Sequence, residues 1–370
     1  MSEELKTNTT PENGVSGGEP ISLRKKFFNF RTLISLILAI GLVVVIVKQC
    51  HVNFTQTWQD IQACNLWYYA LAFVCYYLTF PVRALRWRYL LRSAGLRKDK
   101  GVEMPSLLAL TQMVMMNWFA NCILYARMGD VYRAYLFKER TGASFSKTLG
   151  TLVAERFLDI LVIVFLTVVA ILWLLLSGGH GWTSNAWTVL GIVLGAGIVL
   201  LLVIVMVLGG MGKFGHKLIN LLPKKLKGFY AMFEQGALSS FGQLRMLTFL
   251  TVVIWLMEAG RLILVAKALE QAFGFNLLGT VGIALFVFAA LANALISAIP
   301  LTPGGLGLVE GGVTLLLMIT GLPKGQALSI TLVDRTISFL SVIGVGLLVF
   351  ASWYTMDVVR KRRSIRAHPR

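Results

Sequence analysis

The sequence has few charged residues and few of the side chains that usually carry catalysis. Only 14% of its 370 residues are charged, whereas 56% are hydrophobic, which is far from the balance of a soluble domain. Its four histidines all lie outside the apolar runs, which argues against a histidine proton relay or a metal site within a membrane. No nucleotide-binding loop, Asp-x-Asp motif or nucleophile–histidine pair is present. We therefore expect no catalytic residue, no metal and no cofactor.

Cysteine is also scarce, with four residues and no metal-ligand spacing. Cys75 and Cys122 lie in apolar segments, where we expect them to be packing residues. Cys50 and Cys64 fall in one short loop that we place outside the membrane. A disulfide between them is compatible with that compartment, and the sequence leaves it open.

Acidic residues are half as numerous as basic ones, 17 against 35, for a net charge of +18. In a soluble protein this excess would suggest nucleic acid as a partner. Here the cations cluster between the apolar runs, which is typical of cytoplasmic loops that touch anionic lipid headgroups. We therefore predict a membrane protein that binds no nucleic acid.

Long apolar runs are what the sequence has in abundance, and a full membrane span takes ~20 such residues. The pattern predicts an all-α polytopic membrane protein with about six full spans and two re-entrant elements of opposite orientation. Loops 178–185 and 271–279 contain no Lys or Arg, while the N-terminal flank and the C-terminal tail are basic. This places both termini in the cytoplasm of a cell-membrane protein. The runs are 33–47, 66–82, 107–125, 157–177, 186–209, 247–270, 280–299 and 327–353.

Two runs do not fit simple crossing. Both flanks of 107–125 are basic, so we expect a hairpin that enters and leaves on the cytoplasmic side, turning near the polar residues Gln112, Asn117 and Asn121. The flanks of 280–320 must both be outside, which predicts a second hairpin from the opposite face.

The domain organisation that follows is simple. Residues 1–22 are predicted to be a disordered cytosolic tail, and 23–355 a transmembrane domain. Within it, 210–246 mixes basic and apolar residues and is predicted to lie on the lipid surface. Residues 356–370 are a basic cytosolic tail.

A break rich in proline and glycine, 300–310, interrupts the second of these runs. Proline cannot sit in a regular helix interior, and irregular backbone at membrane depth survives only where protein buries it or where it lines a wet cavity. The break contains the candidate site residues Pro303, Gly304, Gly305, Gly307 and Glu310.

The charge pattern around the two runs repeats. Asp130 precedes Arg156 by 26 positions, and Glu310 precedes Arg335 by 25 positions. Each arginine follows an acid, Glu155 or Asp334, that we expect to open a spanning helix. One unit begins inside and the other outside, as in the inverted repeats of transporters.

A charge at the bilayer centre costs ~2.5–3.5 kcal/mol, so it usually faces the protein interior and has a partner. Glu258 and Arg261 are three positions apart and can pair on one helix, either as a packing pair or as part of a site. Arginine suits phosphate recognition. For Arg83, Arg86, Arg88 and Arg92 we prefer snorkelling to the interface. The remaining predicted binding residues are Arg127, Asp130, Arg133, Glu155, Arg156, Asp159, Asp334 and Arg335.

At these residues the chain resembles a known family. The stretch Ile299-Pro-Leu-Thr-Pro-Gly-Gly-Leu-Gly-Leu-Val-Glu310 is similar to the signature of the flippase-like transmembrane family of lysylphosphatidylglycerol synthases. Ala154-Glu-Arg-Phe-Leu-Asp159 resembles its Glu-Arg-x-x-Asp segment. Arg127-Met-Gly-Asp-Val-Tyr-Arg133 resembles its Arg-x-Gly-Glu-x-x-Arg segment, with Asp130 where Glu is usual and without the customary proline before Arg127.

The resemblance covers roughly residues 25–355 and implies a lipid-translocating membrane domain. It does not imply aminoacyl transfer, since the transferase of the two-domain synthases is a separate soluble C-terminal domain. Our leading hypothesis is a flippase for an anionic phospholipid or a polyprenyl-phosphate lipid. The alternatives are a membrane enzyme of lipid modification, either lysylphosphatidylglycerol synthase-like or a glycosyltransferase, and an accessory subunit of a lipid or glycan pathway. The sequence leaves open two protein partners, a lipid-biosynthesis enzyme and a second copy of the chain.

Overall fold

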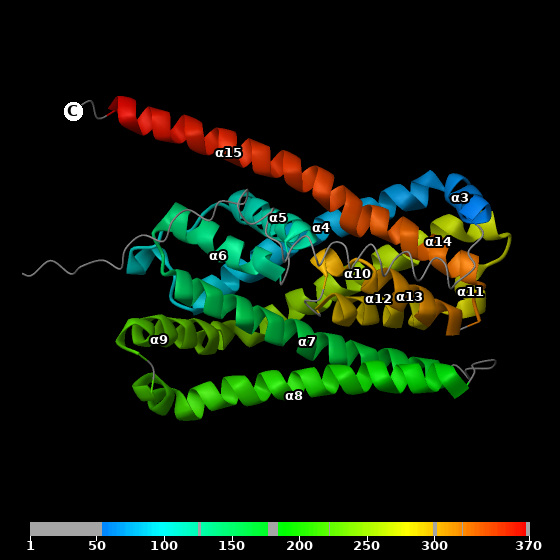
Figure 1. Cartoon of the computed structure of the whole chain (residues 1–370), viewed down its shortest axis with the longest axis horizontal. Helices are drawn as coiled ribbons and strands as arrows, with labels where there is room; N and C mark the ends of the chain where they lie inside the picture. Colours follow the sequence, from blue (N-terminus) through cyan, green and yellow to red (C-terminus); the bar gives the residue numbers. More distant parts are fainter. Residues whose placement is uncertain are drawn as a thin grey trace, which may run out of the picture.

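The computed structural model describes residues 54–124, 127–176, 184–221, 223–298, 302–319 and 321–367, and the chain in these ranges folds into helices joined by short turns, with no strand among them (Figure 1). The all-α prediction is confirmed. The first apolar run, the tail 1–22 and Cys50 lie outside the described residues.

The first half of the described chain contains six α-helices and one short 3₁₀ helix. Pro81 lies inside α4 without ending this helix. The elements are α3 (Phe54–Gln62), α4 (Leu66–Ser93), η1 (Lys98–Lys100), α5 (Leu107–Ile123), α6 (Met128–Thr141), α7 (Phe145–Leu176) and α8 (Ser184–Leu221).

The second half repeats much of this order. It includes a π-helical turn, η5, between two α-helical stretches of one long rod. The elements are α9 (Lys224–Leu238), η3 (Ser239–Gln243), α10 (Leu244–Phe273), α11 (Leu277–Val281), α12 (Ile283–Ala298), η4 (Pro303–Gly305), α13 (Leu308–Ile319), α14 (Lys324–Arg335), η5 (Thr336–Leu340) and α15 (Ser341–Ala367).

Among the described residues, three helical stretches are long and apolar enough to cross a membrane, namely Phe145–Trp173, Leu244–Phe273 and Lys324–Trp353. Shorter apolar helices include Leu107–Ile123 and Ile283–Ser297, which are too short to cross with the usual ~20 residues. Large apolar side chains such as those of α8 and α15 are exposed on the outside of the bundle. This distribution is that of a membrane protein, whose apolar exterior faces lipid.

Each half places a hairpin of two short helices before a long helix. In Figure 1 the α5–α6 hairpin opens toward the left of the bundle and the α12–α13 hairpin opens toward the right, so their turns meet near the centre. Helices α7 and α14–α15, which follow them, also run in opposite directions, as do α4 and α10, which precede them and pack together. The oppositely oriented hairpins that the sequence predicts are thus present.

Two details of the prediction are wrong. The first hairpin turns only after α5 has ended at Ile123, so the polar residues from Gln112 to Asn121 lie within α5. Neither Glu155 nor Asp334 opens a helix, because α7 begins at Phe145, close after Gly142 ends α6 in a left-handed conformation, and α14 begins at Lys324. Both acid–arginine pairs therefore sit well inside the bundle, at the depth of the hairpin turns.

Candidate functional site

A cavity of about 140 Å³ lies where the two hairpin turns meet, with room for about five water molecules. Five arginines and two carboxylates line it, together with aromatic side chains from α4, α5, α10 and η5. The lining is therefore strongly biased toward positive charge, as an anion-binding site requires. The charged lining residues are Arg83, Arg127, Arg156, Asp159, Glu258, Arg261 and Arg335.

The turn of the first hairpin is held by side-chain amides and by an unusual backbone. Arg127, the residue before α6, adopts a left-handed conformation with φ 52°, which is uncommon for a residue with a side chain. Its Nη1 donates to the carbonyl of Ser297 on α12, 2.9 Å away. Asn121 Oδ1 accepts from the backbone N–H of Gly129 at 2.8 Å, and a Cβ on Gly129 would collide with the backbone oxygen of Asn117. Only glycine fits there.

The turn of the second hairpin depends on glycine conformations and on one carboxylate. Gly304, Gly305 and Gly307 all have positive φ, and a Cβ on Gly304 would overlap the ring of Phe339. Glu310 Oε2 accepts from the N–H of Gly307 at 2.6 Å. The carboxylate thus satisfies a donor that the broken helix leaves free.

Each hairpin is tied to the long helix that follows it by an ion pair at an equivalent position. Arg335 Nε contacts Glu310 Oε1 at 2.7 Å, and its Nη2 donates to the carbonyl of Gly304 at 2.9 Å. In the first half, Arg156 Nη2 lies 3.5 Å from Asp130 Oδ1. The matched spacings of 26 and 25 residues therefore correspond to two real contacts.

The two ion pairs are not equally tight. The side chains of Arg156 and Asp130 are 29% and 19% exposed, whereas those of Arg335 and Glu310 are 10% and 11% exposed. The first hairpin thus has the longer and more exposed of the two pairs, although Arg133 of α6 also ties it to Glu155 of α7. The two halves therefore have the same arrangement of hairpin and ion pair, but the two ion pairs differ in length and exposure.

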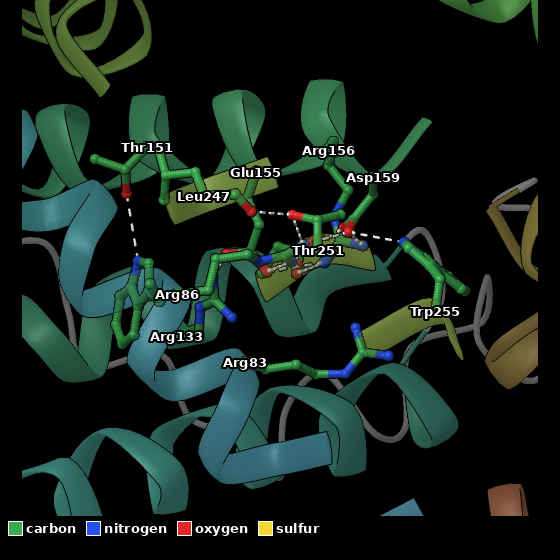
Figure 2. Close-up of polar contacts among 12 residues, drawn as sticks. Arg83, Arg86, Arg133, Thr151, Glu155, Arg156, Asp159, Leu247, Thr251 and Trp255 are labelled. Atoms are coloured by element: carbon green, nitrogen blue, oxygen red, sulfur yellow. Dashed lines mark hydrogen bonds and ion pairs between the residues drawn. The ribbon is translucent and has the colours of Figure 1, made fainter. Parts of the chain in front are cut away.

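Beside the cavity, Arg86 from α4 is completely buried between two carboxylates of α7 (Figure 2). Its Nη1 lies 2.6 Å from Asp159 Oδ1 and its Nη2 lies 2.9 Å from Glu155 Oε1. Arg133 from α6 binds the other oxygen of Glu155 and stacks on Trp87, 4.3 Å from the ring centre. Glu155 thus connects α4, α6 and α7.

On the other side, Glu258 joins α4 to α10. Its Oε1 lies 2.7 Å from Arg83 Nη2 and its Oε2 lies 3.2 Å from Arg261 Nη2, which confirms the pair expected on one helix. Arg261 also binds Asp334. The guanidinium of Arg83 lies 4.8 Å from the ring centre of Trp118 on α5, a cation–π contact.

The expectation that Arg83 and Arg86 snorkel to the interface is therefore wrong. Their exposed fractions are 2% and 0%, and carboxylates from distant parts of the sequence neutralise both. Arg92 is exposed, near the end of α4. The apolar stem of an arginine does not indicate whether its guanidinium is buried in an ion pair or reaches the interface.

The structure brings all the predicted site residues to this region, in two layers. Those that line the cavity are Arg127, Arg156, Asp159, Glu258, Arg261, Gly304, Gly305 and Arg335. Those that lie behind them, in the turn or in ion pairs with lining arginines or their partners, are Asp130, Arg133, Glu155, Pro303, Gly307, Glu310 and Asp334.

Several lining residues carry no signal in the sequence. Arg83 was assigned to the interface, and the aromatic residues Tyr76, Trp118 and Trp255 resemble ordinary membrane-helix residues. Trp255 Nε1 donates to Asp159 Oδ1 at 3.3 Å (Figure 2). Thr302 stands between the two prolines of the break, and that position was the one available clue to it.

Comparison with known proteins agrees with this architecture. The family model for the lysylphosphatidylglycerol synthase transmembrane region matches residues 32–346. The chain belongs to this family. The family's sequence pattern thus spans both hairpins and every charged residue of the cavity.

Archaeal relatives match along much of the chain. A UPF0104 membrane protein of Methanocaldococcus jannaschii is 30% identical over 63% of this chain and 93% of its own length. A UPF0104 membrane protein of Methanothermobacter thermautotrophicus is 26% identical over 92% of this chain and 97% of its own. The glycosyltransferase AglD of Haloferax volcanii is 24% identical over 72% of this chain, but the match covers 46% of AglD.

Proposed function

We propose that this protein moves an anionic lipid between the leaflets of a membrane, binding its headgroup in the cavity between the two hairpin turns. The observation that carries the proposal is the position of the cavity. It lies at the meeting point of two oppositely oriented hairpins and is lined by five arginines against two carboxylates. Broken helices whose ends line a central site are the usual arrangement of transporters with inverted repeats.

The cavity chemistry supports an anionic headgroup. Arginine binds phosphate oxygens in a planar, bidentate geometry, and it stays charged when buried. In a low-dielectric interior such a cluster attracts an anion more strongly than it would in water. The phospholipid phosphate and the polyprenyl phosphate share this chemistry.

The unequal ion pairs supply a route for movement. Alternating access needs two gates that open one at a time. Arg156–Asp130, the longer and more exposed pair, holds the first hairpin, while Arg335–Glu310 holds the second more tightly. In our proposal, the headgroup enters past the first hairpin when the Arg156–Asp130 pair opens. It reaches the opposite face when this pair closes and the Arg335–Glu310 pair opens.

We place the protein in the cell membrane with both termini in the cytoplasm, because the basic segments then lie on the cytoplasmic side. In this orientation the α5–α6 hairpin enters from the cytoplasm. The gate with the longer ion pair would then face the cytoplasmic leaflet.

A transport assay tests the proposal. The full chain is reconstituted in liposomes that contain fluorescent phosphatidylglycerol, and a membrane-impermeant quencher reports the lipid that reaches the outer leaflet. We expect exchange well above protein-free liposomes, and a loss of at least about tenfold in Arg335→Gln, the size of one lost charge-assisted hydrogen bond. Arg97→Gln is the control, since this side chain is 52% exposed and remote from the cavity. Wild-type protein that moves neither this lipid nor a polyprenyl phosphate would contradict the proposal.

The likeness to AglD favours a second candidate, a non-catalytic membrane subunit that works with a separate enzyme of a lipid or glycan pathway. The two candidates differ in what the purified chain does alone. Exchange by the chain alone supports the flippase. No exchange alone, with exchange or product formation after addition of the partner enzyme, supports the subunit, and lysyl or glycosyl transfer by the chain itself would establish an enzyme instead.

A further inference from the structure

Arg127 is the one cavity arginine for which the structure gives no carboxylate partner within the described residues. It makes its hydrogen bond to a neutral carbonyl, that of Ser297. Every other arginine of the region is matched. Asp130, Glu155 and Asp159 hold Arg86, Arg133 and Arg156; Glu258 and Asp334 hold Arg83 and Arg261; Glu310 holds Arg335.

The region therefore carries a single positive charge in excess, from seven arginines and six carboxylates. The parts of the two turns outside the described residues, 125–126 and 299–301, contain no side chain that is charged at neutral pH. Since an unneutralised charge is costly at this depth, the surplus at Arg127 needs a partner that the described residues do not provide.

The second hairpin turn contributes an unpartnered donor to the same cavity. The hydroxyl of Thr302 has no hydrogen-bond partner among the described residues, although Thr302 is 5% exposed and lines the cavity. Buried hydroxyls almost always have a partner, so such an exception needs an explanation. A bound headgroup oxygen would satisfy it, and would at the same time neutralise Arg127 from the first turn.

We propose that Arg127 and Thr302 bind the phosphate of a lipid headgroup with one negative charge, a phosphodiester, and that the site discriminates against a phosphomonoester dianion. This inference rests on the proposed function and narrows its substrate class. One bound phosphodiester brings the net charge of the region to zero. A monoester approaches two negative charges above its second pKa of about 6, which leaves a net negative charge beside six carboxylates in a low-dielectric interior.

A matched set of lipids tests the charge rule. Binding to the full chain in detergent is measured at pH 8 for phosphatidylmethanol, phosphatidic acid and phosphatidylcholine with identical acyl chains. The first two differ by one methyl ester and hence by one charge, and the third is a phosphodiester with no net charge. We expect phosphatidylmethanol to bind at least about tenfold more tightly than either of the others. Equal or tighter binding of phosphatidic acid overturns the inference.

Variants separate the charge rule from misfolding. Arg127→Gln should weaken phosphatidylmethanol binding about tenfold, and Thr302→Val about fivefold, as expected for one charged and one neutral hydrogen bond. Arg92→Gln, an exposed control, should bind as wild type. Asp130→Asn raises the surplus to two charges and should shift preference toward phosphatidic acid, a gain that a damaged fold cannot produce. Wild-type binding in both Arg127→Gln and Thr302→Val overturns the assignment.

The outcomes distinguish this inference from the function on which it rests. Phosphatidylmethanol selectivity without lipid exchange in liposomes supports the binding site and contradicts transport. Exchange with a preference for phosphatidic acid supports transport and contradicts the phosphodiester rule. No binding of any of the three lipids contradicts the headgroup site and both proposals with it.

Discussion

Glu155 is the carboxylate whose loss should disturb the largest part of the fold, and its replacement by glutamine gives the sharpest stability prediction. It is 2% exposed and holds Arg86 from α4 and Arg133 from α6. Glutamine keeps the volume but removes the charge, so two buried guanidinium groups lose a counter-ion. Removing one partner of a buried ion pair typically destabilises a protein by about 3–5 kcal/mol.

The structure places this loss at the lower end of that range. Arg86 keeps Asp159, whose Oδ1 lies 2.6 Å from Nη1, while Arg133 retains only its stacking on Trp87 within the described contacts. About 3 kcal/mol corresponds to a fall of roughly 5–10 °C in the apparent Tm. Thermal unfolding of the purified protein in detergent, followed by tryptophan fluorescence, measures this.

A matched control and a rescue decide whether charge is the cause. Asp99→Asn breaks an ion pair with Arg97 in which both side chains are more than half exposed and the atoms are 3.7 Å apart, so it should cost less than about 1 kcal/mol. Adding Arg133→Met to Glu155→Gln removes the unpaired cation and should recover at least half of the lost Tm. If Glu155→Gln melts like wild type, or if the double variant melts lower than the single one, buried charge balance does not hold these helices together.

Two further predictions concern the hairpin turns and the buried arginines. Gly129→Ala should prevent the close packing of α5 on α6 and reduce the yield of folded protein. Gly191→Ala in α8, where a Cβ meets open space, should leave the yield unchanged. Size-exclusion profiles measure both yields, and equal yields would show that the turn tolerates a side chain. Arg83→Gln should lower the apparent Tm by several degrees because it leaves Glu258 with one partner fewer. Arg92→Gln, at an exposed position, should leave the Tm unchanged. Equal melting curves of the two variants would support the interface assignment of Arg83.

The sequence was informative about the hairpins because their signals are local. Proline and glycine at 300–310 mark a broken helix in any context, and basic flanks around 107–125 exclude a simple crossing. The nearly equal spacings of Asp130–Arg156 and Glu310–Arg335 also revealed the repeat, although they did not show that the two residues of each pair are in contact.

The cavity itself was beyond local reasoning. Arg83 and Glu258 are 175 positions apart, so no periodicity links them, and an arginine near a basic loop looks like one that reaches the interface. The sequence places Thr302 in the proline- and glycine-rich break, but only the folded chain shows that it lines the same cavity as the turn of the first hairpin. Long-range charge pairing depends on how α4 crosses α10, which only the folded chain specifies.

Access to the cavity from both sides of the membrane tests the central claim most directly. Ser297→Cys places a thiol in the cavity lining, in a chain whose four native cysteines are replaced, and an impermeant thiol reagent is added to either side of oriented proteoliposomes. We expect modification from each side, slowed by phosphatidylglycerol. Thr314→Cys, buried between α13 and α14 and 3% exposed in wild type, should stay unmodified. Modification of Ser297→Cys from one side alone would contradict a site that opens alternately to both leaflets.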